Sequence, residues 1–201
     1  MLCETDLASL NEILEQALAR LAEGYFEDAI DGFSEYLLIE PNEPKAYQGR
    51  AQANFQIKNW TAAISDFRRA TELNPEDLES RVGWGTSLAR VDQIYEAIDI
   101  FENLLAKSPH YVQAHIQLGA LYYRLGIIKK GHLQMDLALA ARPSLPERRL
   151  IERLKSEQMT LDKKRFYRPD FEELRRKSAE RGGLIKRILD FIKNKFQNKE
   201  I

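Results

Sequence analysis

The sequence has only one cysteine and no long apolar run, and each of these features excludes some classes of protein. Cys3 alone forms neither an internal disulfide nor a cysteine-rich zinc site, which favours a reducing compartment. Residues 1–15 contain four acidic side chains without a basic start or an apolar core, so no signal peptide is predicted. The longest apolar run, Leu137–Ala141, is far shorter than the ~20 residues of a membrane-spanning helix. We therefore expect a cytoplasmic protein without a transmembrane helix.

The sequence also lacks the short motifs that mark common catalytic sites. It contains no nucleophile elbow, phosphate-binding glycine loop, zinc-protease pattern or EF-hand loop. A metal site needs three or four suitable ligands, and the histidines are only His110, His115 and His132. We interpret His115 and His132 as packed core residues. The expectation is a protein that is not an enzyme and has no cofactor and no metal site.

The charge is unevenly distributed, although the net charge is only −1. Residues 1–143 contain 13 basic and 21 acidic side chains, whereas residues 144–201 contain 17 basic and 10 acidic ones. Such an asymmetry indicates a basic segment that docks on its own acidic body or reaches an anionic partner, or two separately solvated surfaces. No nucleic-acid-binding motif accompanies the basic residues, so nucleic acid is not an expected partner.

An internal repeat of constant length organises most of the chain. Pro41, Pro75, Pro109 and Pro143 follow one another at the same interval. That interval also relates two sets of small residues and one set of large apolar ones: Ala17, Ala51, Gly85 and Gly119; Ala29, Ala63, Ala97 and Gly131; Phe33, Phe67, Phe101 and Met135. Four registers agree without a gap, which indicates a tandem array.

This unit resembles the tetratricopeptide repeat, a helix-turn-helix module of about 34 residues. The family's W-x2-LG-x2-Y segment is represented by His115, Leu118, Gly119 and Tyr122 in the fourth unit. The resemblance implies an all-α fold, a right-handed superhelical solenoid. Its units are expected at 10–43, 44–77, 78–111 and 112–145, within an array over 10–143 that follows a lead-in at 1–9.

The repeated residues also have a physical explanation. Small side chains such as Gly85 and Ala97, or Ala51 and Ala63, let the two helices of a unit approach closely. The phenylalanines recur on one face of the second helix in the first three units and predict the core. A proline at the end of each unit lacks the N–H that another helical turn needs, so the helix stops there.

A capping helix is predicted after the last unit. Ser144 and Glu147 form a capping-box pattern with Pro146 in the first turn, so we expect a capping helix and basic linker over 144–168. Asp170 and Glu173 repeat the pattern at the start of a basic helical tail, 169–201.

The tail contains a predicted amphipathic helix at 184–199, basic on one face and apolar on the other. Its apolar contact residues are Leu184, Ile185, Ile188, Leu189, Ile192 and Phe196. Three interpretations stay open for this helix. It docks on the chain's own repeats or a second copy, it binds a partner or an anionic membrane surface, or it frays in solvent.

The resemblance also implies a concave groove lined by the first helix of each unit. The corresponding contact side chains are Lys45, Gln48, Gln52, Phe55 and Gln56 in the second unit; Glu79, Val82, Thr86 and Arg90 in the third; Gln113, Ile116, Gln117, Tyr123 and Arg124 in the fourth. The glycines Gly49 and Gly83 occupy groove positions among them. Glutamine amides both donate and accept hydrogen bonds, so they suit the backbone of an extended peptide; alternatively, they only keep the groove solvated.

One subfamily of these repeats captures the Glu-Glu-Val-Asp terminus of heat-shock chaperones with Lys, Asn and Arg side chains. The matching positions are Leu14, Leu18, Gly49, Glu79 and Gly83 in the first three units, and Gln48, Gln52, Gly83, Gln113 and Gln117 in the last three. None is a cation, which argues against that ligand.

The sequence thus predicts a non-enzymatic adaptor or assembly factor that holds a peptide or helix of a protein partner in the groove. The alternative is a peripheral membrane-surface protein anchored by its basic amphipathic C-terminal helix. Self-association through an uncapped repeat face is a third hypothesis.

Overall fold

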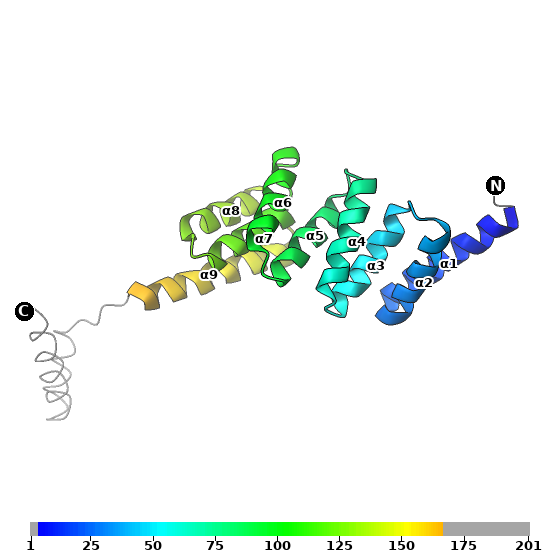
Figure 1. The fold of residues 1–201 in the computed structure, drawn as a ribbon. Coiled ribbons are helices and arrows are strands. Elements are labelled where there is room, and N and C mark those ends of the chain that lie inside the picture. Colours follow the sequence, from blue (N-terminus) through cyan, green and yellow to red (C-terminus); the bar gives the residue numbers. More distant parts are fainter. Residues whose placement is uncertain (1–3, 167–201) are drawn as a thin grey trace, which may run out of the picture. The chain divides into compact units, whose positions relative to one another are not determined.

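The internal repeat folds into successive pairs of helices (Figure 1). The computed structural model describes residues 4–166, with side chains from 10 to 162, and this part of the chain forms nine α-helices and no strand. They are α1 (Glu4–Glu23), α2 (Phe26–Ile39), α3 (Pro44–Gln56), α4 (Trp60–Leu73), α5 (Leu78–Arg90), α6 (Ile94–Lys107), α7 (Val112–Arg124), α8 (Ile128–Ala140) and α9 (Leu145–Phe166). The all-α prediction is confirmed for these residues. The segment 1–9, expected as a lead-in, is helical from Glu4.

The turn inside each pair is made by a residue in the left-handed backbone region. Gly24, Lys58, Asp92 and Gly126 occupy this position, one in each repeat, with φ of 88°, 64°, 65° and 72°. The left-handed residue ends the first helix of the pair and lets the second begin two residues later. Two of the four are not glycine and therefore adopt a conformation that is unfavourable for a residue with a Cβ.

The turn between pairs is held by the carbonyl of the repeated proline. Side chains that occupy one repeat position bond to the proline carbonyl of the preceding turn: Tyr47 to Pro41 at 3.2 Å, Arg81 to Pro75, and the Nε2 of His115 to Pro109 at 2.9 Å. This is the position of the tryptophan in the repeat signature. Three different side chains anchor the same turn, so the contact is maintained although the residue type is not.

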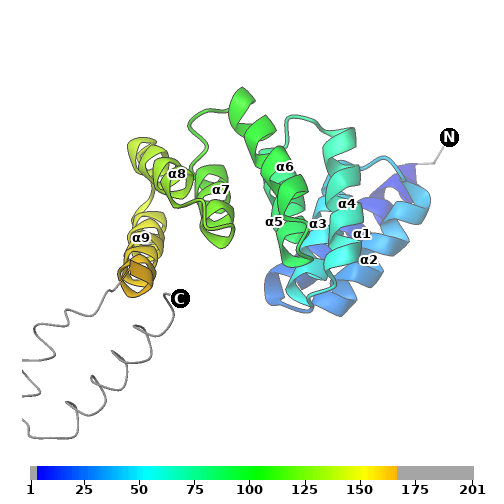
Figure 2. The same cartoon turned by 60° about the vertical axis from the view of Figure 1, so that its left-hand side comes forward.

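Small residues bring the helices of each pair together, as predicted. Ala51, Ala63 and Ala97 are fully buried, and so are Phe33 and Phe101. The helices α1 to α8 lie side by side in chain order, and α1, α3, α5 and α7 also contact their neighbours in that series (Figure 1 and Figure 2).

The close approach between pairs depends on glycines. A Cβ on Gly49 of α3 would lie 2.3 Å from Cζ of Phe33, and a Cβ on Gly83 of α5 would lie 2.4 Å from Cζ of Phe67. Each phenylalanine ring of one pair therefore packs directly against the backbone of the next pair. The sequence analysis placed both glycines in the groove and missed this packing role.

The third junction, between α6 and α7, is built differently. The residue equivalent to Gly83 in the next pair is Gln117, which is half-buried. The ring of Phe101 instead lies against Gly85 of its own pair, where a Cβ would be 2.8 Å from Cζ. The α6–α7 contact is completed by apolar side chains that include Leu104, Leu118 and Leu121.

The helix α9 covers the last pair. Ile151 is fully buried against Ile116, Met135 and Ala138, and Lys155 Nζ lies 2.5 Å from Asp136 of α8. The helix begins with the predicted capping box, since the backbone N–H of Ser144 donates to Glu147 at 2.8 Å. The helices α1 to α8 and α9 as far as Gln158 form one compact unit.

Gly49→Ala should lower the free energy of unfolding by about 2 kcal/mol. The new Cβ would overlap the ring of Phe33, and the energetic cost of this overlap is larger than the gain in helix propensity from alanine. Urea denaturation of the variant measures the change, and Gln117→Ala, at the same repeat position without a ring beneath it, is the control with a small effect. Addition of Phe33→Leu should recover part of the loss. Equal or greater stability of Gly49→Ala contradicts the proposed packing role.

Lys58→Gly should raise the free energy of unfolding by about 0.5–1 kcal/mol, because glycine adopts the left-handed conformation without strain. Glu35→Gly, an exposed change in the middle of α2, should instead lower it by about 1 kcal/mol. Thermal denaturation of the two variants distinguishes these signs. A loss of stability in both would show that Lys58 is not strained.

Candidate functional site

A groove of about 520 Å³ crosses α3, α5 and α7. Its walls and floor come from the first helices of three consecutive pairs, together with one aromatic ring from α4 and one from the turn before α7. The lining residues are Gln52, Phe55, Gln56, Phe67, Glu79, Val82, Gly83, Thr86, Arg90, Tyr111, Gln113 and Gln117. The first helices face the groove because their opposite sides are buried against the second helices.

Nine of the predicted contact side chains line this cavity together with Gly83, and five do not. The nine are Gln52, Phe55, Gln56, Glu79, Val82, Thr86, Arg90, Gln113 and Gln117. Among the others, Lys45 is exposed and Gln48 is half-buried on α3, outside the lining. Ile116 is only 2% exposed, because α9 covers that part of α7. We therefore leave Ile116 out of the proposed contact surface.

The remaining two predicted residues are engaged in contacts within the fold. The hydroxyl of Tyr123 lies 2.8 Å from Nδ1 of His132, and its ring occupies the space where Gly131 would carry a Cβ. Arg124 donates to the carbonyl of Ala89 at 2.9 Å and to Asp92 at 3.1 Å. Both side chains strengthen contacts between neighbouring helices.

Two lining residues were missed by sequence reasoning, Phe67 and Tyr111. Phe67 reaches the groove because Gly83 has no side chain to cover its ring. Tyr111 precedes α7, outside the helical positions that the resemblance assigns to the groove. Burial raises its pKa above the ordinary value, and the carboxylates of Glu79 and Asp77 raise it further. The phenol therefore stays protonated at neutral pH and can donate a hydrogen bond.

The neutral polar surface of the groove consists mainly of side-chain amides. Gln52, Gln56, Gln113 and Gln117 all line it, and none of the four side chains makes a hydrogen bond with any residue between 10 and 162. Each amide retains both a donor and an acceptor for a bound molecule. The apolar part of the surface comes from Phe55, Phe67 and Val82.

The charged residues of the groove lie at the two ends of α5. Glu79 is in its first turn, and Arg90 is its last residue. The guanidinium of Arg90 lies 5.8 Å from the ring centroid of Trp60, and that ring packs edge-on against Phe55 at 4.8 Å. Trp60 and Phe55 thus orient the arginine beside the groove.

A second cavity of about 390 Å³ adjoins the first toward the N-terminal pair. It is lined by Leu18, Leu21, Ala22, Phe26, Gln52 and Gln56. Gln52 and Gln56 line both cavities, so the two are parts of one continuous surface. Toward the N-terminal pair its apolar walls come from the aliphatic and aromatic side chains of Leu18, Leu21 and Phe26.

Comparison with known proteins identifies the repeats. Residues 14–77 match the family model described as tetratricopeptide repeat. Solved structures with the same fold include MamA (TM-score 0.64, 22% identity, 69% of this chain and 81% of that one) and YrrB (0.67, 20%, 76% and 77%). YrrB is described as a TPR protein with an unusual peptide-binding site. The family model thus covers the first two helix pairs, and the array as a whole has the fold of tetratricopeptide-repeat structures.

Another solved tetratricopeptide structure is the first TPR of Spaghetti (RPAP3) bound to the HSP90 peptide SRMEEVD, with a TM-score of 0.55 and 23% identity over 58% of this chain and 93% of that one. Among curated relatives, sperm-associated antigen 1 of Rattus norvegicus is 28% identical over 86 residues, 43% of this chain and 10% of that protein. The RNA polymerase II-associated protein 3 of Homo sapiens is 23% identical over 142 residues, 71% of this chain and 21% of the relative. The chain thus matches only about a tenth and a fifth of the lengths of these relatives.

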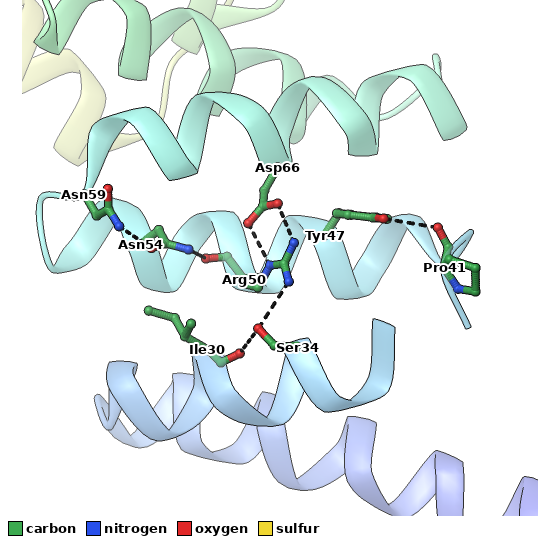
Figure 3. Close-up of polar contacts among 8 residues, drawn as sticks. All are labelled: Ile30, Ser34, Pro41, Tyr47, Arg50, Asn54, Asn59 and Asp66. Atoms are coloured by element: carbon green, nitrogen blue, oxygen red, sulfur yellow. Dashed lines mark hydrogen bonds and ion pairs between the residues drawn. The ribbon is translucent and has the colours of Figure 1, made fainter. Parts of the chain in front are cut away.

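A polar network holds the helix that carries Gln52 and Gln56 in place. Arg50 of α3 donates two hydrogen bonds to Asp66 of α4, at 2.9 and 2.8 Å, and a third to Ser34 of α2 at 3.1 Å. Figure 3 shows the guanidinium between the two neighbouring helices, with Asp66 on one side and Ser34 on the other. The side chain of Asp66 is 9% exposed. Arg50 therefore joins three consecutive helices of the tetratricopeptide array.

The histidines make separate contacts. His115 is buried, with Nδ1 at 2.7 Å from Gln134 and Nε2 at 2.9 Å from Pro109. His132, also predicted in the core, is only half-buried and contacts Tyr123. Within the described part of the chain, no three His, Cys, Asp or Glu side chains gather in a way that could hold a metal ion.

The predicted tail contact surface lies outside the described residues. This applies to Leu184, Ile185, Ile188, Leu189, Ile192 and Phe196, and to the second capping box at Asp170 and Glu173. None of the helices described between residues 4 and 166 is long and apolar enough to cross a membrane.

Asp66→Asn should lower the free energy of unfolding by about 1–3 kcal/mol, because the half-buried guanidinium of Arg50 loses two charge-assisted hydrogen bonds. Chemical denaturation measures the loss. The matched control is Glu72→Gln, which removes an exposed carboxylate paired with Arg68 and Arg69 and should cost less than about 0.5 kcal/mol. Equal effects of the two variants would show that burial does not strengthen the Arg50 network.

Proposed function

We propose that this chain is a non-enzymatic adaptor that holds an extended segment of a protein partner in the groove across α3, α5 and α7. The observation that carries the proposal is the set of four glutamine amides without internal partners, Gln52, Gln56, Gln113 and Gln117. They line a surface whose apolar part includes Phe55 and Val82. The fold and the groove support a binding role.

The groove suits an extended segment better than a helix. An extended chain leaves its backbone N–H and C=O groups unpaired, and side-chain amides can satisfy both kinds of group in either direction. A helix has already paired most of its backbone and offers amides little to bind. The protonated phenol of Tyr111 adds one more donor.

The tetratricopeptide neighbours support peptide binding as a class of function. YrrB is described with a peptide-binding site, and the Spaghetti repeat is bound to an HSP90 peptide. This chain has no cation at the positions that would hold the carboxylates of such a chaperone tail. Those positions are Leu14, Glu79 and Gly83 in the first three units, or Gln48, Gln113 and Gln117 in the last three. We therefore propose a partner other than the chaperone terminus.

A displayed library of random decapeptides tests the proposal without a known partner. Peptides selected on the wild-type chain should bind Gln52→Glu and Gln117→Glu about 10-fold more weakly. Each change removes an amide donor and places a negative charge against backbone carbonyls, at a cost of about 1.4 kcal/mol. Fluorescence anisotropy with the selected peptides measures the affinities.

The matched control is Asn103→Asp, the same amide-to-acid change on an exposed position of α6 outside the groove. It should leave peptide affinity unchanged. If the selected peptides bind all three variants equally, or if the library yields no specific binder, the groove is not the binding site.

A further inference from the structure

One position of the repeat reveals an arginine whose charge is left uncompensated. At the C-terminal ends of the first helices of the four pairs, the equivalent residues are Ala22, Gln56, Arg90 and Arg124. Two are arginines on neighbouring helices, and their contacts differ. This difference indicates the charge of the ligand group that binds beside Arg90.

Arg124 uses its guanidinium within the fold. It donates to the carbonyl of Ala89 and to the carboxylate of Asp92. These two residues flank Arg90 in sequence, so the carboxylate nearest to Arg90 along the chain is already paired with another cation.

Arg90 has no carboxylate within ion-pair distance among residues 10–162. Its only specific contact there is with the ring of Trp60, which holds the guanidinium beside the groove without neutralising it. A planar guanidinium in this setting offers paired N–H donors that match a carboxylate. Glu79 lies at the other end of α5, where its negative charge repels an acidic group of the ligand. The preferred position of an anion is therefore beside Arg90.

The N-terminal part of the same surface selects a different group. Leu18, Leu21 and Phe26 are half-buried and line the adjoining cavity, whose other wall is formed by Gln52 and Gln56. A cavity of this size with apolar walls accommodates a leucine, methionine or phenylalanine side chain. From α1 to α5 the surface crosses two helix spacings, about 20 Å, which an extended chain covers in about six residues.

We infer that the partner segment carries a carboxylate that binds Arg90 and, about six residues away, a bulky apolar side chain that fills the cavity between α1 and α3. This inference rests on the proposed function, since it specifies the chemistry of the segment held in the groove. The ligand is therefore an extended peptide with one acidic and one apolar side chain. Arg90 binds the acid, the cavity binds the apolar side chain, and the neutral amides between them contact the peptide backbone.

The decapeptide library tests the inference through the composition of the binders. Peptides selected on the wild-type chain should be enriched in an Asp or Glu located roughly five to seven residues from a Leu, Met or Phe. Arg90→Glu should weaken them at least 10-fold, and a new selection on Arg90→Glu should yield Lys or Arg at the place of the acid. Lys129→Glu, an exposed and equal change of charge on α8, is the control and should alter affinity less than two-fold.

A second pair of variants tests the pocket. Ala22→Arg places a long side chain in the cavity wall and should reduce binding at least 10-fold, whereas Ala19→Arg, an exposed change on α1 outside the cavity, should not. Circular dichroism of each variant verifies that the fold is retained.

The possible outcomes distinguish failure of this inference from failure of the proposed function. Binders that depend on Gln52 and Gln117 but show no acid, and no response to Arg90→Glu, overturn the inference and leave the proposed function standing. Binders that tolerate Ala22→Arg overturn the pocket assignment. Recovery of no groove-dependent peptide overturns both the proposed function and the inference.

Discussion

The contact between a phenylalanine ring and the backbone of the next helix pair is the constraint on which the first three pairs depend. Phe33 meets Gly49 and Phe67 meets Gly83, each with less than 2.5 Å between the ring and the place of a Cβ. No residue other than glycine leaves room for the ring at this separation. The repeated glycine thus sets the distance between successive pairs, and with it the spacing of the helices that form the groove.

The same contact shapes the functional surface. Because Gly83 has no side chain, the buried ring of Phe67 packs against its backbone and still forms part of the groove lining. One step along the array, Gln117 takes the glycine position and contributes an amide to the groove, while Phe101 turns to Gly85 of its own pair. A single repeat position therefore decides both how closely two pairs pack and whether a side-chain amide enters the groove at that point.

The arginines show how neighbouring residues assign different roles to one type of side chain. Arg50 is bound by Asp66 and Ser34 and connects three helices. Arg124 is bound by Asp92 and Ala89 and joins neighbouring pairs. Of these three arginines, only Arg90 has no carboxylate partner among residues 10–162. It contacts the ring of Trp60, and its charge is available to a ligand. Sequence position does not distinguish these roles, because Arg90 and Arg124 are equivalent in the repeat.

The sequence by itself determined the period, the helix pairs and the core phenylalanines, because a regular spacing of small, aromatic and proline residues is compatible with one arrangement of stacked helices. It also identified most of the groove, since the first helix of each pair presents a predictable face. It did not distinguish Ile116, which α9 covers, from its exposed equivalents, nor did it include Phe67 and Tyr111. Only the tertiary structure decided those cases, because the exposure of a side chain depends on which distant helix packs over it and on whether its neighbour has a Cβ.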